Sequence, residues 1–84
     1  MKFSFSKHAL GQIANRSIEH TDVINVLETP DDILELENNQ LVYQKLFISS
    51  LGIKYMVRAF INGNQNPALV KTVYLTTKLN KYIK

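Results

Sequence analysis

Apolar residues recur at helical spacing in the first third of the chain and alternate with polar residues through the rest. Between residues 7 and 17 the apolar positions are three or four residues apart, which predicts a first helix, and Ser6 before it is a suitable N-cap. Thr21 is the expected N-cap of a second helix, which ends before Thr29 because the residue ahead of Pro30 is pushed out of the helical region. The apolar stripes expected to face the core are Leu10, Ile13, Ala14 and Ile18 in the first helix, and Val23, Ile24 and Leu27 in the second.

The residues after the helices alternate as strands do, and turn residues separate the runs. Short connections between the runs imply antiparallel neighbours. The predicted fold class is therefore α+β, with two N-terminal helices packed on one face of an antiparallel sheet of four to five strands, in a single domain covering residues 1–84. The predicted strands are 33–37, 41–49, 53–61 and 68–76, and residues 2–5 can add a short fifth.

The alternation also predicts which face of the sheet the helices cover, since successive strand residues point to opposite faces. Gln44 and Lys71 are polar misfits in this assignment, and a β-bulge would flip part of a strand. The predicted core sets are Val42, Leu46 and Ile48; Ile53, Tyr55, Val57, Ala59 and Ile61; and Leu69, Val73 and Leu75. The opposite, open face then gathers Tyr43, Lys45, Arg58, Thr72, Tyr74 and Thr76, with apolar patches from Phe47, Met56 and Phe60.

Charge is strongly segregated along the chain. All seven acidic residues lie between Glu19 and Glu37, where there is no basic residue, whereas residues 38–84 carry seven positive charges and no carboxylate. A strand region of this kind suits a polyanion, and RNA is the expected partner. The alternative interpretation is that the acidic segment folds beside the basic one and the charges largely cancel.

Composition excludes several classes of protein. The chain has no cysteine, and no apolar run exceeds three residues, so we expect a soluble cytoplasmic domain without disulfides, thiol chemistry or membrane spans. The carboxylates are confined to residues 19–37, which disfavours a magnesium-dependent nuclease. His8 and His20 do not form a metal motif, and there is no glycine-rich phosphate loop, so neither a metal nor a cofactor is expected.

The remaining chemistry is acid–base and electrostatic catalysis on RNA, in which the ribose 2′-hydroxyl attacks the adjacent phosphate. Arg58 is the strongest phosphate-binding candidate, because guanidinium holds a phosphate through two parallel hydrogen bonds. Lys45 could neutralise the same phosphate, and Tyr74 could donate a proton. His8 stands in the first helical turn, where the helix dipole favours the neutral ring that a general base needs. For each residue the alternative is an ordinary structural or solvated side chain.

Short motifs spread over nearly the whole chain carry a resemblance to known proteins. They are Phe3 to Ala9, Ile13, Arg16 and Ile18, Val23, Leu27 and Pro30, Val42 to Lys45, Val57 and Arg58, Lys71 to Tyr74, Thr77 and Lys78, and Lys81 and Tyr82. By these residues the sequence resembles an uncharacterised bacterial family, a domain of unknown function considered related to the RelE-like, barnase-like and colicin-like ribonuclease toxins. The resemblance implies two helices on an antiparallel sheet with the site on the sheet, and it departs from the family pattern at Ser17, where a glycine is expected, and at Lys81, where an arginine is expected. The positions that match family motifs and carry polar or charged groups are His8, Arg16, Lys45, Arg58, Thr72, Tyr74 and Lys78.

These observations lead to the hypothesis of a metal-independent endoribonuclease of toxin type. Its expected partners are RNA and an acidic antitoxin protein, with the ribosome as a further candidate. The alternative is a non-catalytic RNA-binding or protein-binding module on the same fold, and a third hypothesis has the acidic segment dock onto a basic protein. The predicted catalytic residues are His8, Lys45, Arg58 and Tyr74, and the predicted RNA-binding residues are Arg16, Tyr43, Thr72, Thr76, Lys78 and Lys81.

Overall fold

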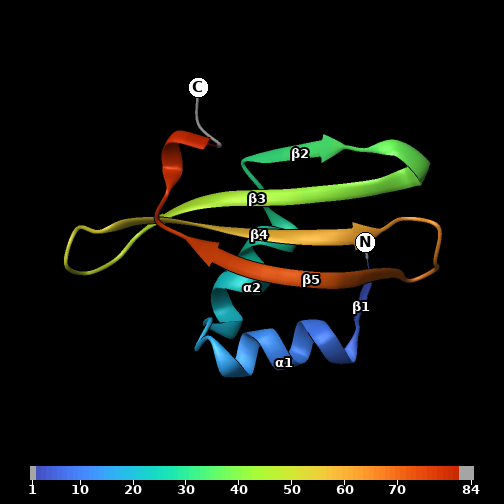
Figure 1. Ribbon diagram of the computed structural model, residues 1–84, viewed down its shortest axis with the longest axis horizontal. Helices are drawn as coiled ribbons and strands as arrows, with labels where there is room; N and C mark the ends of the chain where they lie inside the picture. The colour runs from blue at the N-terminus through green and yellow to red at the C-terminus, as the bar shows by residue number, and fades with distance from the viewer. Residues whose placement is uncertain (1, 82–84) are drawn as a thin grey trace.

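The computed structural model describes residues 2–81 as two short helices packed against one sheet (Figure 1). The second helix passes directly into the edge strand of the sheet, and a turn of 3-10 helix follows the last strand. The elements are β1 (Phe3–Phe5), α1 (Lys7–Asn15), α2 (His20–Glu28), β2 (Asp32–Glu35), η1 (Glu37–Asn39), β3 (Gln40–Ile48), β4 (Lys54–Asn62), β5 (Ala68–Thr76) and η2 (Leu79–Lys81).

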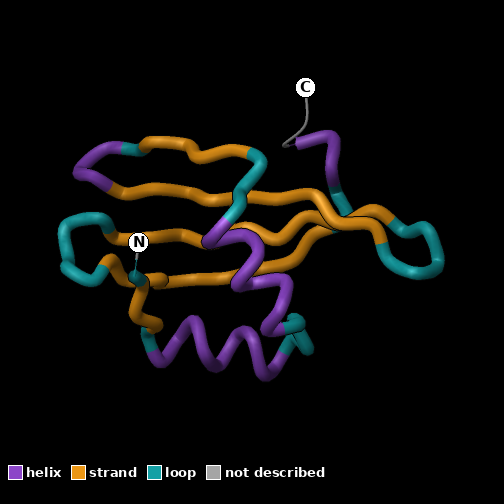
Figure 2. The backbone as a smooth tube through the Cα atoms, turned by 180° about the vertical axis from the view of Figure 1, so that it is seen from behind, coloured by secondary structure: helices purple, strands orange, loops and turns teal. Residues whose placement is uncertain are grey.

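The five strands lie in the order β1-β5-β4-β3-β2, and both helices cover the same face of the sheet (Figure 2). Strands β2 to β5 form an antiparallel meander, whereas β1 runs parallel to β5. The α+β prediction is therefore confirmed, and the sheet is mixed rather than wholly antiparallel. Because β1 is connected to the rest of the sheet through both helices, no tight hairpin forces it to run antiparallel. Neither α1 nor α2 is long and apolar enough to cross a membrane.

Ser6 starts α1 as predicted and also ties the helix to the sheet. Its Oγ accepts a hydrogen bond from the Ala9 amide at 3.0 Å and donates one to the Lys71 carbonyl at 2.9 Å. The predicted cap at Thr21 is wrong, since Glu19 occupies the N-cap of α2 and Thr21 lies within its first turn. The reason lies in the preceding turn, in which Ser17 adopts a φ of 51° and reverses the chain within a few residues.

The core lies between the two helices and the face of the sheet that they cover. The second helix ends at Glu28, as predicted. Within the helix stripes, however, Leu10 and Ile24 are each 49 % exposed and Ala14 is exposed, whereas Ala9 and Val26 are fully buried in their place. The core consists of Ala9, Ile13, Ile18, Val23, Val26, Leu27, Tyr43, Val57, Ala59, Ile61, Val70 and Val73.

Strand β3 is turned over relative to the prediction. Tyr43 pairs with Ala59 and Lys45 pairs with Val57, so both belong to the helix-covered face, together with Phe47. Gln44 pairs with Arg58 on the opposite face. The prediction failed because both faces of the sheet bury apolar residues: Val42 and Met56 are buried although no helix covers them.

Strand β5 contains a bulge at Lys71. Ile61 pairs with Val70 and Phe60 pairs with Thr72, which leaves Lys71 as an extra residue. The bulge turns Val70 into the core, so the predicted inward orientation of Leu69 and outward orientation of Val70 are wrong. Beyond the bulge the predicted orientations are confirmed: Val73 and Leu75 are on the helix side, and Thr72, Tyr74 and Thr76 are on the open side. Leu75, which was predicted in the core, is nevertheless 37 % exposed. Ile53, which was predicted in the core, precedes β4 and is 54 % exposed.

Candidate functional site on the open sheet face

The open face is the side of β3, β4 and β5 that the helices do not cover, and Arg58 stands at its centre. The residues opposite Arg58 in the register are Gln44 on β3 and Tyr74 on β5. The Arg58 Nε donates to Gln44 Oε1 at 3.0 Å, and Nη1 donates to the Tyr74 hydroxyl oxygen. The guanidinium is thus held from both sides by side chains of neighbouring strands.

Two aromatic rings fix the same guanidinium from a second direction. The Arg58 Cζ lies 5.4 Å from the Phe60 ring centroid and 5.6 Å from the Tyr74 ring centroid. The two rings are themselves stacked, with centroids 5.9 Å apart and planes at 25°. Cation–π attraction at these distances favours one orientation of the guanidinium and adds to the effect of the hydrogen bonds.

Further cations stand on either side of Arg58. Lys54 is four residues before Arg58 on the same strand, so it is on the same face, and it is exposed. Lys71 reaches across the sheet from the bulge, and its ammonium donates to the Gln40 side chain. None of the three strands contains a carboxylate. The open face therefore carries a row of positive charge that its own strands do not neutralise.

The acidic segment lies elsewhere, in α2 and β2. Among the described residues, one ion pair joins it to the basic strands, between Lys45 and Asp31 on the helix side (3.5 Å). The Lys45 ammonium also donates to the Thr29 carbonyl at 2.7 Å. These contacts hold the α2–β2 connection against β3. Most of the acidic residues are thus away from Arg58; Asp32, which pairs with Gln44, is on the open side of the sheet but at its β2 edge, two strands from Arg58.

Of the predicted catalytic residues, the structure brings Arg58 and Tyr74 together and places the other two elsewhere. Lys45 is on the helix-covered face, in the contacts just described. His8 is exposed in the first turn of α1, in the layer on the far side of the sheet from Arg58. A substrate phosphate bound by Arg58 would therefore meet neither side chain.

The predicted RNA-binding residues divide in the same way. Thr72 and Thr76 accompany Arg58 on the open face. Tyr43 is buried under the helices, where its ring contacts Phe3 edge-on at 5.7 Å, and Arg16 is exposed at the end of α1. Lys78 is exposed just after β5; Lys81 ends η2 but its side chain is not described, and Tyr82 lies outside the described residues.

The sequence prediction missed Gln44 as a site residue. It is 3 % exposed and is the buried polar partner of the guanidinium. The signal was its position as a polar misfit in an otherwise apolar strand, because buried polar side chains are retained where they have a hydrogen-bond partner.

Tyr55 is a second polar contact, on the helix side. Its hydroxyl donates to the Asp22 carboxylate at 2.7 Å, and its ring stacks on Phe47 with centroids 5.4 Å apart. The hydrogen bond to Asp22, then burial, then the negative charges of Asp22 and Glu19 raise the pKa of Tyr55 to about 12 from 10.0. This contact joins α2 to β4 and is separate from the open face. Within residues 2–81 no three histidine or acidic side chains gather as metal ligands do.

Residues 5–75 match the family model described as a domain of unknown function, DUF4258. The chain belongs to the DUF4258 family. The matched segment runs from β1 to β5 and so includes the whole Gln44–Arg58–Tyr74 row. Comparison with curated proteins gave no match. Comparison with solved structures gave none either.

Proposed function

We propose that this DUF4258 domain is a metal-independent endoribonuclease of toxin type that binds RNA on its open sheet face. The observation that supports this most is the Arg58 guanidinium, which Gln44 and Tyr74 hold in place at the centre of a surface without carboxylates on its three strands. Guanidinium binds phosphate oxygens in a fixed, often bidentate geometry. A preoriented arginine on a basic sheet face favours a backbone phosphate as its ligand.

The flanking residues suit a nucleic-acid strand rather than an isolated anion. Lys54 and Lys71 extend the positive charge to either side of Arg58, so a bound strand would meet a cation at several points along the face. Phe60 and Tyr74 supply stacked aromatic rings beside the guanidinium. Single-stranded RNA is recognised by this combination of phosphate contacts and base stacking.

In the proposed reaction, the ribose 2′-hydroxyl attacks the adjacent phosphorus as its proton passes to water. A bond from the 2′-oxygen to phosphorus forms, and the bond to the 5′-oxygen breaks. Arg58 stabilises the added negative charge on the phosphorane, and the Tyr74 phenol protonates the departing 5′-oxygen. The products are a 2′,3′-cyclic phosphate and a free 5′-hydroxyl, and the phenol is restored by water.

The position of His8 favours a second candidate, a non-catalytic RNA-binding module. Neither His8 nor Lys45 lies beside Arg58, so Tyr74 is the proton-transfer group that the described part of the chain provides there. A module that only binds needs Arg58, the lysines and the aromatic rings. In either case an acidic protein such as an antitoxin would compete with RNA for the open face.

The deciding experiment measures both binding and cleavage of a labelled single-stranded RNA in excess chelator. The variants are Arg58→Ala and Tyr74→Phe, with Lys45→Ala as the matched control because it removes one positive charge from the opposite face. The endoribonuclease predicts chelator-resistant cleavage to a 2′,3′-cyclic phosphate that Arg58→Ala and Tyr74→Phe abolish and Lys45→Ala preserves.

Other outcomes separate the two candidates. Salt-dependent binding that requires Arg58, with no cleavage over a wide pH range, would replace the enzyme by the binding module. Cleavage that chelator abolishes would exclude the mechanism above. Equal binding by wild type and Arg58→Ala would exclude the open face as the RNA surface, provided that circular dichroism shows both proteins folded.

A further inference from the structure

Strand β2 forms an exposed edge of the sheet. It is the terminal strand in the described order, next to β3, and all four of its residues are exposed. Ile33 and Leu34 remain 49 % and 41 % exposed, and Leu36, which follows the strand, is 50 % exposed. An edge with three exposed apolar side chains in four residues is a template for pairing with another strand.

The register shows which backbone groups of this edge point outward. The Leu36 amide donates to the Gln40 carbonyl, in line with the antiparallel pairing of Leu34 with Val42. In an antiparallel pair, alternate residues bond inward, so the intervening residues Ile33 and Glu35 direct their amide and carbonyl groups away from β3. An added strand would find two donors and two acceptors at this edge.

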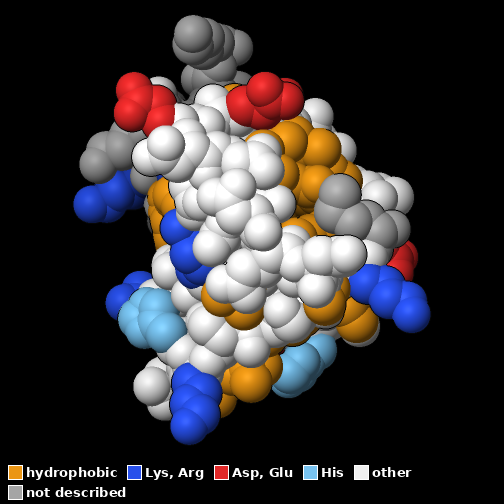
Figure 3. All heavy atoms as spheres, turned by 90° about the vertical axis from the view of Figure 1, so that its right-hand side faces the viewer, with side chains coloured by type: hydrophobic (Ala, Val, Ile, Leu, Met, Phe, Trp, Pro, Cys, Tyr) orange, Lys and Arg blue, Asp and Glu red, His pale blue; other side chains and the backbone are white. Residues whose placement is uncertain are grey.

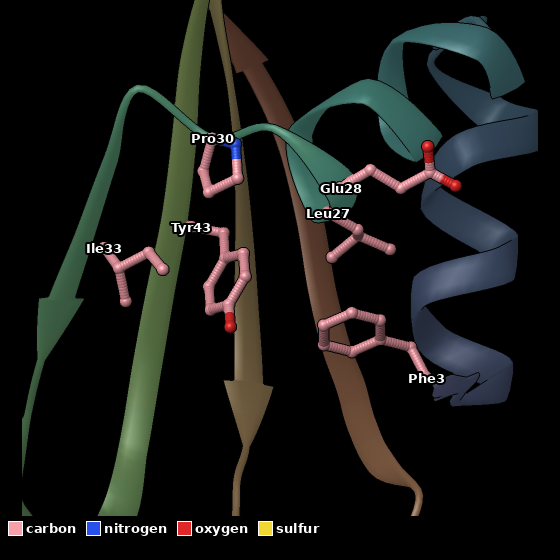
Figure 4. A pocket seen from close by; sticks show the side chains of 6 residues that line it. All are labelled: Phe3, Leu27, Glu28, Pro30, Ile33 and Tyr43. Carbon is pink, nitrogen blue, oxygen red and sulfur yellow. The ribbon is translucent and has the colours of Figure 1, made fainter. Parts of the chain in front are cut away.

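A cavity of about 470 Å³ opens beside the strand on the helix side. Figure 4 shows the Tyr43 ring between Ile33 and Phe3, with Pro30 and Leu27 also facing this space, while the Glu28 carboxylate is directed away from Ile33. Five of the six lining residues are apolar or aromatic, and Glu28 is the charged one. A side chain reaching past Ile33 would therefore bury apolar surface in this cavity.

The charge of the edge identifies the kind of partner. Asp32 and Glu35 are on β2, Glu37 follows it, and no cation stands between residues 19 and 37. In Figure 3 acidic side chains occupy the upper end of the molecule, with apolar surface directly beside them. A second copy of this chain would bring the same acidic residues against them, and RNA would add further negative charge, so both are disfavoured.

We propose that β2 is a docking site for an extended, basic segment of a partner protein, which adds to the sheet as a sixth strand. Backbone hydrogen bonds to Ile33 and Glu35 hold the segment in register. Its positive side chains lie beside Asp32, which is on the same side of the sheet as Gln44, and its apolar side chains lie beside Ile33 and the cavity on the helix side. Strand addition of this kind obtains affinity from the main chain and specificity from alternate side chains. The site is separate from the open face and does not depend on the proposed RNA chemistry.

The test uses a fluorescent peptide of about eight residues that alternates lysine and valine, a typical strand length with the expected pattern. Two matched peptides are measured beside it: one with glutamate in place of lysine, and one with N-methyl groups that block one hydrogen-bonding edge. Fluorescence anisotropy should show saturable binding of the basic peptide, with at least about a tenfold loss for each matched peptide.

Protein variants test the same contacts from the other side. Glu35→Pro removes both the outward amide and the charge, whereas Glu35→Gln removes the charge alone. Any affinity for the peptide that Glu35→Pro loses beyond the loss in Glu35→Gln therefore measures the backbone contact. Ile33→Ala should weaken peptide binding. Ile53→Ala is the control and should not, because Ile53 is comparably exposed but lies at the far end of the sheet. Circular dichroism checks that each variant folds; if Glu35→Pro does not, the methylated peptide still tests the backbone contact.

Several results would overturn the proposal. Equal binding of the basic and methylated peptides would mean that charge alone attracts the peptide, and no binding of the basic peptide would remove the site. Displacement of the peptide by single-stranded RNA would place it on the open face instead. A dimer in analytical ultracentrifugation that Glu35→Pro dissolves would show that a second copy occupies the edge.

Discussion

The Arg58 Nε lies 3.0 Å from Gln44 Oε1, so a residue that is only 3 % exposed orients the central cation of the open face. Gln44→Leu removes this acceptor while keeping a similar volume. It should lower the free energy of unfolding by about 1–2 kcal/mol, because the guanidinium loses a partner, and it should weaken RNA binding through a less ordered Arg58. Urea denaturation and fluorescence anisotropy measure the two effects.

Gln44→Glu separates those two effects. The carboxylate can still accept from Arg58 and adds an opposite charge, so folding should be retained, while neutralisation of the guanidinium should reduce RNA affinity. Affinity equal to that of wild type in a folded Gln44→Glu protein would mean that Arg58 does not contact the phosphate.

The contact between Tyr55 and Asp22 predicts a loss of stability at alkaline pH. Since the pKa of Tyr55 is raised to about 12 from 10.0, the fold favours the protonated phenol. This contribution is complete below pH 10 and disappears as the pH rises through about 12. Tyr55→Phe should cost about 1 kcal/mol near neutral pH, and its difference from wild type should shrink between pH 10 and 12. Urea denaturation of both proteins across this range measures the difference; a constant difference would contradict the assignment.

Sequence patterns were sufficient for the elements because the strongest local signals agree with the fold. Proline at residue 30 ends α2 where expected, and Ser6 caps α1 through the Ala9 amide. The strands shift by about one residue at their ends, for example Gln40–Ile48 instead of 41–49. Arg58 and Tyr74 were both assigned to the open face, and the structure joins them by a hydrogen bond.

The rest of the site depends on contacts that a binary pattern does not encode. Strand β3 has apolar residues at both parities, and Val42 is 1 % exposed on the open side, so burial does not distinguish its two faces. The bulge at Lys71 places Val70 in the core. The Lys71 carbonyl accepts a hydrogen bond from the Ser6 hydroxyl, and these two residues are far apart in the sequence. The prediction put Lys45 and Tyr43 on the wrong face because β3 has apolar residues on both of its faces.

The turn after α1 holds Ser17 in a left-handed conformation and gives a further prediction. Ser17 has a φ of 51°, and the following amide, of Ile18, donates to the Ile13 carbonyl at 3.0 Å, as at a helix C-terminus where glycine is preferred. Ser17→Gly should therefore raise the free energy of unfolding by about 1 kcal/mol. Thermal and urea denaturation check this. Ser17→Ala is the control and should give no gain, since alanine has the same backbone restriction.

Two glycines should respond in opposite ways to the same substitution. A Cβ at Gly63 would lie 2.8 Å from the Asn39 carbonyl oxygen, which already accepts the Gly63 amide at 3.0 Å, whereas a Cβ at Gly11 meets no atom within 4 Å. Gly63→Ala must push apart the loops that close the β2–β3 and β4–β5 ends, and should cost about 1–3 kcal/mol. Gly11→Ala lies within α1 and should stabilise the protein by up to about 1 kcal/mol, because alanine is the better helix former. Urea denaturation of the two variants beside wild type measures the change in the free energy of unfolding for each. A Gly63→Ala protein as stable as wild type would show that these loops separate at little cost.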